Sequence, residues 1–246
     1  MYFPIRNALC CLFVIFFALA NVFAESPHPV VLELFTSQGC SSCPPADKLL
    51  GEIQKEAHSK RLPIYPLSFH VDYWNFLGWR DPYSRPFASE RQRQYNAYLK
   101  AGVFTPQVIV NGSKSAIGSE SELVHRLIQA ELRQPPEYLP EIELSRVGST
   151  VRLSGTLKGS YAKFINVAAV RNGGENFVSS GENSGSSLSH INVVVDFQRE
   201  SVSQEGHRPF SIEVATSDQA NGVLVYGEGE AMKVLWAKWF VLREEP

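Results

Sequence analysis

Two cysteines, Cys40 and Cys43, stand where a short apolar run gives way to the start of a helix. Residues 30–35 read Val-Val-Leu-Glu-Leu-Phe, a nearly continuous apolar run that is typical of a strand buried on both faces. Pro44 and Pro45 follow the second cysteine, and prolines fit the first turn of a helix because its amides have no internal partner. The sequence therefore predicts a strand, a short loop, and a helix that begins at the two cysteines.

The chain that follows alternates between patterns typical of strands and of helices. Short apolar runs predict strands, and longer runs that are rich in Glu, Arg and Gln predict helices. Asn111-Gly112 favours a hairpin turn, and Ser119 with Glu122 forms a capping box that begins a helix. The predicted order is strand, helix, strand, helix, strand, strand and helix, over residues 30–35, 44–57, 64–69, 84–100, 107–110, 115–117 and 119–132.

The cysteine pair and this order of elements resemble the thioredoxin superfamily. The likeness covers roughly residues 29–134 and includes Thr105-Pro106, directly before the third strand. Within the superfamily, the segments ELFTSQGCSSCPPAD (33–47) and HVDYWNFLGWRDP (70–82) are similar to a family of secreted bacterial proteins with no assigned function. The resemblance implies a mixed four-stranded sheet with flanking helices, and a cis peptide bond at Pro106 whose proline faces the disulfide.

The second half of the chain differs in character from the first. Pro135, Pro136 and Pro140 mark a linker, because paired prolines cannot continue a helix. Short alternating runs with turn residues between them are typical of an antiparallel sandwich of about seven strands. We therefore predict an α/β thioredoxin-like domain over residues 25–136 and an all-β, sandwich-like domain over residues 137–246. The predicted strands of the second domain are 141–144, 150–157, 164–170, 192–197, 210–214, 223–226 and 232–241.

Residues 1–24 have the pattern of a Sec-type signal peptide. Arg6 precedes an apolar run over residues 8–20, and a cleavage point follows Ala24. An uncleaved membrane anchor is the alternative, but the run is shorter than the ~20 residues that span a bilayer. We expect a periplasmic or secreted protein without membrane insertion after cleavage, in which Cys40 and Cys43 are the remaining cysteines.

The spacing of Cys40 and Cys43 suits thiol-disulfide exchange. Two thiols three residues apart close too small a loop to stabilise a fold usefully, so redox chemistry or metal binding is left as their purpose. The thiolate is the attacking species, and a helix N-terminus stabilises it. We expect Cys40 to be the exposed nucleophile and Cys43, one turn deeper, to resolve the mixed disulfide. The sequence thus favours an enzyme, an exported thiol-disulfide oxidoreductase that uses no organic cofactor.

Glu33 lies in the middle of the first apolar run, where a carboxylate is costly unless it has a partner. In thioredoxin a buried carboxylate at nearly this position helps to move a proton to or from the resolving thiol. The resemblance therefore implies a catalytic role for Glu33, as a general base for Cys43. The alternatives are that Glu33 points to solvent or pairs with an arginine.

Four further residues are candidates for substrate binding. The resemblance implies that Thr105 and Pro106 lie against the disulfide and contact its substrate. Trp74 and Trp79 belong to an aromatic segment over residues 69–83. Such a segment predicts either a groove wall that holds an extended substrate or a satellite core under a long loop.

Two other functions would use the same cysteines. A soft metal such as copper could bind to Cys40, Cys43 and His70, because thiolates select such ions. A zinc site would need a second Cys or His pair at ligand spacing, which the sequence lacks. The third possibility is a binding module whose C-x-x-C is only a closed disulfide. The loop over residues 181–187 could reach across to this disulfide, although its composition is typical of a turn.

The formal net charge of −2 gives no basic field for nucleic acid. The partners must therefore suit the cysteines. We expect a protein or a small thiol as the disulfide substrate, and a membrane-bound electron donor as a possible recycling partner.

Overall fold

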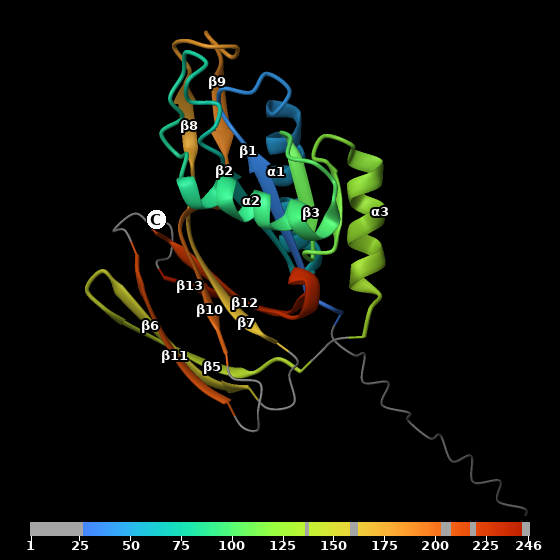
Figure 1. Ribbon diagram of the computed structural model, residues 1–246, viewed down its shortest axis with the longest axis vertical. Coiled ribbons are helices and arrows are strands. Elements are labelled where there is room, and N and C mark those ends of the chain that lie inside the picture. Colours follow the sequence, from blue (N-terminus) through green and yellow to red (C-terminus); the bar gives the residue numbers. More distant parts are fainter. Residues whose placement is uncertain (1–26, 136–137, 158–161, 203–207, 217–219, 243–246) are drawn as a thin grey trace, which may run out of the picture.

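The structure is a computed structural model that describes residues 27–135, 138–157, 162–202, 208–216 and 220–242 (Figure 1). The predicted signal peptide, residues 1–24, lies outside these described residues. The helices and strands predicted up to residue 132 are all present, with small shifts of their ends. They are β1 (Val30–Thr36), α1 (Pro44–Lys60), β2 (Ile64–His70), α2 (Pro86–Leu99), β3 (Gln107–Val110), β4 (Lys114–Ile117) and α3 (Ser121–Leu132).

The strands predicted in the second half are also present, together with a hairpin of two short strands that the sequence does not predict. These two strands have four residues each and are largely polar, so they give no alternating pattern. The elements are β5 (Glu141–Val147), β6 (Thr150–Leu157), β7 (Phe164–Arg171), β8 (Gly174–Phe177), β9 (Ser187–His190), β10 (Val193–Ser201), β11 (Arg208–Ala215), β12 (Gly222–Glu228), the 3-10 helix η1 (Glu230–Met232) and β13 (Val234–Val241). Within the described part of the chain, no helix combines the length and the apolar character that a membrane crossing requires.

The arrangement of the strands shows that the predicted fold class is wrong. We expected a four-stranded α/β domain and a separate all-β sandwich, but one eight-stranded mixed sheet runs through both halves, in the order β13-β12-β7-β10-β2-β1-β3-β4. β10 pairs parallel with β2, with Val193 opposite Ser68, and the Ser68 N–H donates to the carbonyl of Asn192 over 3.0 Å. The apolar pattern shows that a strand is buried but not which strand pairs with it. The outer edge of β2 is thus covered by a strand from the second half.

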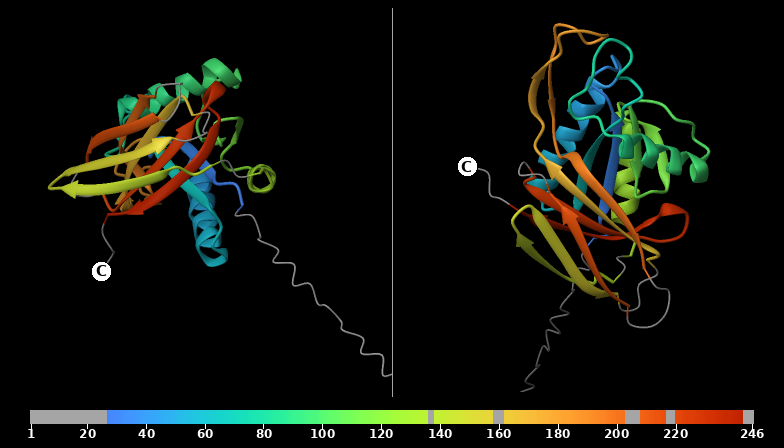
Figure 2. Two further views of the ribbon diagram at one scale, coloured as in Figure 1. Left: turned by 90° about the horizontal axis from the view of Figure 1, so that it is seen from below. Right: turned by 60° about the vertical axis from the view of Figure 1, so that its left-hand side comes forward.

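Both faces of this sheet are covered. One face carries α2, and on the other face α1 and α3 lie over β1 and β3. A second, three-stranded sheet in the order β11-β6-β5 packs on the β7 and β12 part of that same face (Figure 2). The core beneath α2 draws on both halves of the chain and includes Phe69, Tyr95 and Leu224. Since apolar burial is the dominant favourable contribution to folding, this shared core stabilises the two halves together.

The β8–β9 hairpin leaves the eight-stranded sheet between β7 and β10. It stands beside the segment over residues 71–85, at the end of the sheet where α1 begins (Figures 1 and 2). β9 also contacts α1. The loop between the two strands, residues 178–186, is here named the cover loop.

Candidate active site

Cys40 and Cys43 form a disulfide at the start of α1. Cys43 is the N-cap residue of this 17-residue helix, and prolines occupy its first positions. The N–H groups of Ala46 and Asp47 donate to the carbonyl of Cys43 over 2.9 and 3.1 Å. The predicted position of the cysteines at a helix N-terminus is therefore confirmed, and the positive end of the helix dipole lies beside them.

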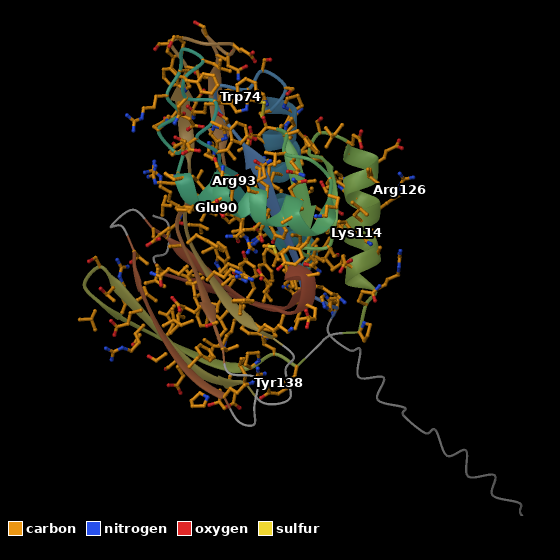
Figure 3. All side chains as sticks on the ribbon, in the orientation of Figure 1. Trp74, Glu90, Arg93, Lys114, Arg126 and Tyr138 are labelled. Carbon is orange, nitrogen blue, oxygen red and sulfur yellow. A yellow bond between two sulfur atoms is a disulfide. The ribbon has the colours of Figure 1, made fainter. Side chains whose placement is uncertain are left out.

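The peptide bond between Thr105 and Pro106 is cis, as the resemblance implied. The hydroxyl of Ser42 donates to the Thr105 carbonyl over 3.5 Å and lies 3.4 Å from Cys40 Sγ. Trp74, labelled in Figure 3, donates from Nε1 to the Thr105 hydroxyl over 2.8 Å. These contacts bring Thr105, Pro106 and Trp74 next to the disulfide. Their contact with a substrate stays a prediction.

Neither cysteine is exposed, so the expectation of an exposed nucleophile is wrong for this conformation. The exposed fraction of both Cys40 and Cys43 is 0%, whereas Ser41 and Ser42 between them are exposed. The local pattern places Cys40 in front of a helix, but it carries no information about what packs on the sulfur from distant parts of the chain.

The cover loop lies against residues 37–43, here named the cysteine loop. A loop that reaches the disulfide was one of the two alternatives that the sequence left open, the other being a plain turn. The side-chain amide of Asn183 donates to the carbonyls of Gln38 and Cys40, each over 2.9 Å. The carboxylate of Glu182 accepts the N–H of Ser41 over 3.1 Å. A loop from the second half of the chain is therefore hydrogen-bonded to the backbone on either side of the first cysteine.

Trp79 and its neighbours pack against the cover loop. Trp79 Nε1 donates to Oε1 of Gln38 over 3.2 Å, and the hydroxyl of Ser180 donates to the carbonyl of Gly78 over 2.6 Å. A Cβ added to Gly181 would come within 3.0 Å of the Trp79 Cβ, so the two backbones approach closely. These contacts favour the packed segment over the open groove wall, and substrate binding by Trp79 stays a prediction.

Glu33 pairs with an arginine, one of the alternatives that the sequence left open. Its two carboxylate oxygens accept Nε and Nη2 of Arg91, both over 3.0 Å. Oε1 also accepts the hydroxyls of Tyr95 and Tyr226 over 2.6 and 3.0 Å. Nη1 of Arg91 donates to Glu228 of β12 over 2.8 Å. Glu33 is thus part of a buried network that joins β1, α2 and β12.

The charges in this network stabilise one another. Burial alone would lower the pKa of Arg91, but the charge of Glu33 raises it well above its ordinary value. Burial raises the pKa of Glu228, yet Arg91 and Arg199 outweigh this and hold it below 4.5. Glu33 faces α2, whereas Leu32 and Leu34 on the other face of β1 pack with α1. Its role as a base for Cys43 stays a prediction, and its contacts favour a structural ion pair.

A second buried polar cluster lies behind the cysteine loop, and His70 is the one of its members that the sequence singled out. Asp47, one turn beyond Cys43, accepts the hydroxyl of Thr36 at Oδ2 over 3.0 Å, and its Oδ1 lies 3.5 Å from Nδ1 of His190. The spacing of four residues from Cys43 is a signal that could have identified Asp47. No local pattern identifies His190, because the hairpin brings it in from the second half.

His70 belongs to the same cluster. Its Nδ1 donates to Oδ2 of Asp81 over 2.7 Å, and its ring lies 4.5 Å from that of His190. Burial raises the pKa of Asp81, but the attraction of His70 and hydrogen bonds, including those from the N–H groups of Gln38 and Tyr83, hold it below its ordinary value. No group of three or more His, Cys, Asp or Glu side chains within the described residues is placed to hold a metal ion, so the copper alternative gains no support.

Comparison with known proteins gives a family and two structural neighbours. The model of a family described as "Protein of unknown function (DUF1223)" matches residues 31–226. The crystal structure of protein AGR_C_4864 from Agrobacterium tumefaciens is 26% identical, covers 91% of this chain and 98% of its own, and has a TM-score of 0.67. HBP35 of Porphyromonas gingivalis is 14% identical and covers 89% of this chain and 77% of its own, with a TM-score of 0.62, a likeness that shows the fold alone. The curated proteins include no match.

Proposed function

Because the chain belongs to the DUF1223 family, whose description assigns no function, we propose one from the site itself: a thiol-disulfide oxidoreductase that acts outside the cytoplasm. The observation that carries the proposal is the Cys40–Cys43 disulfide at the start of α1, next to the cis Thr105–Pro106 bond. This local arrangement resembles that of the thioredoxin superfamily. The sulfur chemistry would need no organic cofactor.

In the proposed reaction Cys40 is the nucleophile. Once the disulfide is reduced, the unpaired amides and the dipole at the start of α1 favour the Cys40 thiolate, and the Ser42 hydroxyl, 3.4 Å from Cys40 Sγ, can donate to it. The thiolate attacks a substrate disulfide and expels one substrate sulfur as a thiolate. Cys43 then attacks Cys40 Sγ, which re-forms the protein disulfide and releases the second substrate sulfur. The substrate gains two electrons and two protons, and the protein loses them.

We infer that access to the sulfurs requires displacement of the cover loop, because this loop is hydrogen-bonded to the backbone around Cys40. Both cysteines are fully buried, so no substrate reaches them in this conformation. Asn183 and Glu182 hold the loop by hydrogen bonds to the backbone of the cysteine loop. A net ~1 kcal/mol for each such bond is small enough for local opening. We therefore place exchange in an open state, in which the loop has moved and Thr105 and Trp74 face the substrate.

The compartment and the partners follow from the same proposal. Cleavage of a signal peptide over residues 1–24 would deliver the protein to the periplasm or the exterior, where disulfides persist. The substrate would be a protein or a small thiol in its disulfide form. A membrane-bound donor or acceptor would restore the redox state of the cysteines after each cycle.

A closed structural disulfide in a binding module is the second candidate, and the burial of both sulfurs favours it. The two candidates differ in how the folded protein behaves towards thiols. An exchange enzyme passes reversibly between oxidised and reduced forms without unfolding. A structural disulfide in a closed site reacts only when the protein unfolds.

The test uses the folded protein in glutathione buffers of graded redox potential. We expect thiol labelling to follow a reversible two-electron transition, with the circular dichroism of the folded chain retained throughout. In parallel, reduced Cys43→Ser should form a stable mixed disulfide at Cys40 with glutathione disulfide, and Cys40→Ser should not accumulate one at Cys43. The same labelling is repeated with increasing concentrations of denaturant. If the thiols are labelled only at concentrations that unfold the protein, the exchange proposal is wrong and the disulfide is structural.

A further inference from the structure

A cavity of about 290 Å³ opens between the first turn of α1 and strand β9, directly behind the cysteine loop. Its lining includes Pro44, Asp47, Lys48 and His190. Asp47 and His190 are only 7% and 4% exposed, whereas Lys48 at the rim is exposed. The cavity therefore connects two buried titratable side chains with solvent, on the side of α1 that carries Cys43.

Two buried atoms of residues that line this cavity make no hydrogen bond within the described part of the chain. No described residue forms a hydrogen bond with Oδ1 of Asp47 or with Nδ1 of His190, although the two lie 3.5 Å apart. A buried polar atom without a hydrogen bond costs about 1–3 kcal/mol. The two atoms that carry this cost, Oδ1 of Asp47 and Nδ1 of His190, are also the atoms that a proton transfer at this site would use.

The neighbours of His190 fix where its proton lies. The indole N–H of Trp79 can only donate, so the Gln38 atom that faces it is Oε1. The Gln38 amide nitrogen then donates to Nε2 of His190 over 3.1 Å. Neutral His190 therefore carries its proton on Nδ1, the atom that faces Oδ1 of Asp47. Held in this way, His190 presents the N–H of Nδ1 to the Asp47 carboxylate and so orients it.

Asp47 is well placed to serve Cys43. The two residues are one helical turn apart, and the Asp47 N–H donates to the Cys43 carbonyl over 3.1 Å. Side chains on a helix lean towards its N-terminus, so a carboxylate four residues after Cys43 is directed towards the turn that contains this cysteine. The Thr36 hydroxyl holds its other oxygen over 3.0 Å. Glu33, in contrast, faces α2 from the opposite side of β1.

We propose, as an extension of the exchange reaction above, that Asp47 accepts the proton of the Cys43 thiol and that His190 is the positioning residue for its carboxylate. In the resolving step the S–H bond of Cys43 breaks and its proton passes to Oδ1 of Asp47. The Cys43 sulfur forms a bond to Cys40 Sγ, and the bond from Cys40 to the substrate sulfur breaks. The leaving sulfur takes the electron pair, and the proton of Asp47 returns to it or to solvent through the cavity.

Other charged or titratable groups surround this pair. Lys48 of α1 lies at the cavity rim. The rings of His70 and Tyr83 lie 4.5 and 5.8 Å from the His190 ring, and His70 is held by Asp81. The pH dependence of the resolving step would therefore report a site that contains these groups as well as Asp47 and Cys43.

The experiment separates the two steps of exchange. Reduced protein is mixed with glutathione disulfide, quenched with acid at successive times and analysed by mass spectrometry, which distinguishes the mixed disulfide at Cys40 from the closed protein disulfide. Asp47→Asn and His190→Gln are compared with wild type over a range of pH. The matched control is Glu131→Gln, a buried carboxylate of α3 that accepts the Asn111 amide over 3.0 Å.

We expect Asp47→Asn to slow closure of the mixed disulfide about 100-fold at neutral pH, a common effect of losing a general base. The deficit should vanish above the ordinary thiol pKa of ~8.5, where no base is needed. His190→Gln should show a smaller deficit with the same pH dependence, and Glu131→Gln none. Formation of the mixed disulfide should be unchanged in all of them.

Closure that matches wild type in both variants, or that is slowed equally at every pH, overturns the role of Asp47 and leaves the exchange function intact. If Asp47→Asn does not fold, the closure rate of His190→Gln is used instead: a deficit at neutral pH that vanishes above pH ~8.5 supports the proposal, and closure equal to wild type or slowed equally at every pH overturns it. If wild type itself forms no mixed disulfide, the exchange function fails, and the role of Asp47 fails with it.

Discussion

Asn183 binds the cover loop to both sides of the first cysteine through two backbone carbonyls. It is itself buried, so its amide has exchanged water for these two acceptors. A hydrogen bond of this kind contributes a net ~1 kcal/mol, which makes the closed loop favourable but reversible. At the scale of single residues, a side chain that is far from the disulfide in the sequence therefore holds the loop that lies beside it.

Asn183→Ala should make the disulfide easier to reduce. Loss of both hydrogen bonds raises the population of the open loop, and we expect reduction by dithiothreitol to become about tenfold faster. Ser184→Ala is the matched control, because its hydroxyl bonds within the hairpin, to the carbonyl of Ser179. The rates are measured by quenching samples with acid at successive times, removing the dithiothreitol, and counting the protein thiols with an alkylating label by mass spectrometry. Equal rates in the two variants would show that the cover loop does not limit access.

Glu33→Gln should destabilise the fold far more than it slows exchange. The substitution removes one of the two carboxylates that pair with Arg91, so Glu228 alone faces the charges of Arg91 and Arg199. Breaking a buried pair in this way costs about 3–5 kcal/mol. Urea denaturation measures the loss, and the assay for mixed-disulfide closure measures the rate. Glu90→Gln on the exposed face of α2 is the control, and its denaturation midpoint should stay at the wild-type value (Figure 3). A fully stable Glu33→Gln with slow closure would restore the role of base.

Local sequence identifies the candidate residues but not their surroundings. The place of Cys40 and Cys43 at a helix N-terminus follows from their spacing and the prolines after them, whereas the cis bond at Pro106 follows from the resemblance to the thioredoxin superfamily. The burial of Cys40 and the contact between Asp47 and His190 depend on the hairpin, which folds back from the second half. The cover loop is rich in glycine and serine, so it has no apolar pattern that would indicate where it packs.

At the scale of elements, α2 joins the two halves of the molecule. Its Arg91 bridges Glu33 of β1 and Glu228 of β12, and Asn166 of β7 also donates to Glu228 over 3.1 Å. Composition and length predict α2 itself, since its run is rich in Glu, Arg and Gln and is as long as a helix. It does not predict that an arginine of this run is buried, because the acidic partners come from strands with apolar patterns.

Stability should fall in acid because of this network. The folded protein holds the pKa of Glu228 below its ordinary value of 4.5, so the unfolded chain binds more protons at low pH. The contribution of Glu228 to the free energy of unfolding is complete above pH 4.5 and is lost as the pH falls through its lowered pKa. The pKa of Asp81 is also lowered, so this group acts in the same direction below pH 3.8. Urea midpoints measured from neutral pH to pH ~3 should decline.

The Glu228→Gln variant identifies the source of this decline. It should be less stable at neutral pH and should lose less stability on acidification than wild type, because its side chain no longer titrates. An acid slope identical to that of wild type would assign the decline to other carboxylates.

At the scale of the whole molecule, the two halves share one sheet and one core. The backbones of the two halves pair over a short stretch, where Val193 lies opposite Ser68. Their side chains share a larger contact, since the core beneath α2 combines β1 and β2 with β7, β10 and β12. Nearly every strand of this sheet is predictable from its own residues. The pairing of β10 with β2 is not predictable, because the alternation of apolar and polar residues along a strand does not depend on which strand lies next to it.

Residues 25–136 produced alone should therefore fail to form a rigid fold. The segment would lose Glu228 as a partner of Arg91 and would expose the face of Phe69 and Tyr95 that packs on the second half. We expect helical circular dichroism with poor dispersion of side-chain NMR signals and binding of a hydrophobic dye. A cooperative thermal transition in the isolated segment would instead support an independent domain up to residue 136.

The β8–β9 hairpin interrupts the chain between two strands, β7 and β10, that are already neighbours in the sheet. A turn of a few residues would suffice to connect them, so the pairing of β7 with β10 does not require the hairpin. A change in the length of the cover loop at its tip would leave this pairing intact. If the exchange proposal holds, selectivity for a redox partner would therefore vary with the cover loop, whereas His190 at the end of β9 would stay part of the sulfur chemistry.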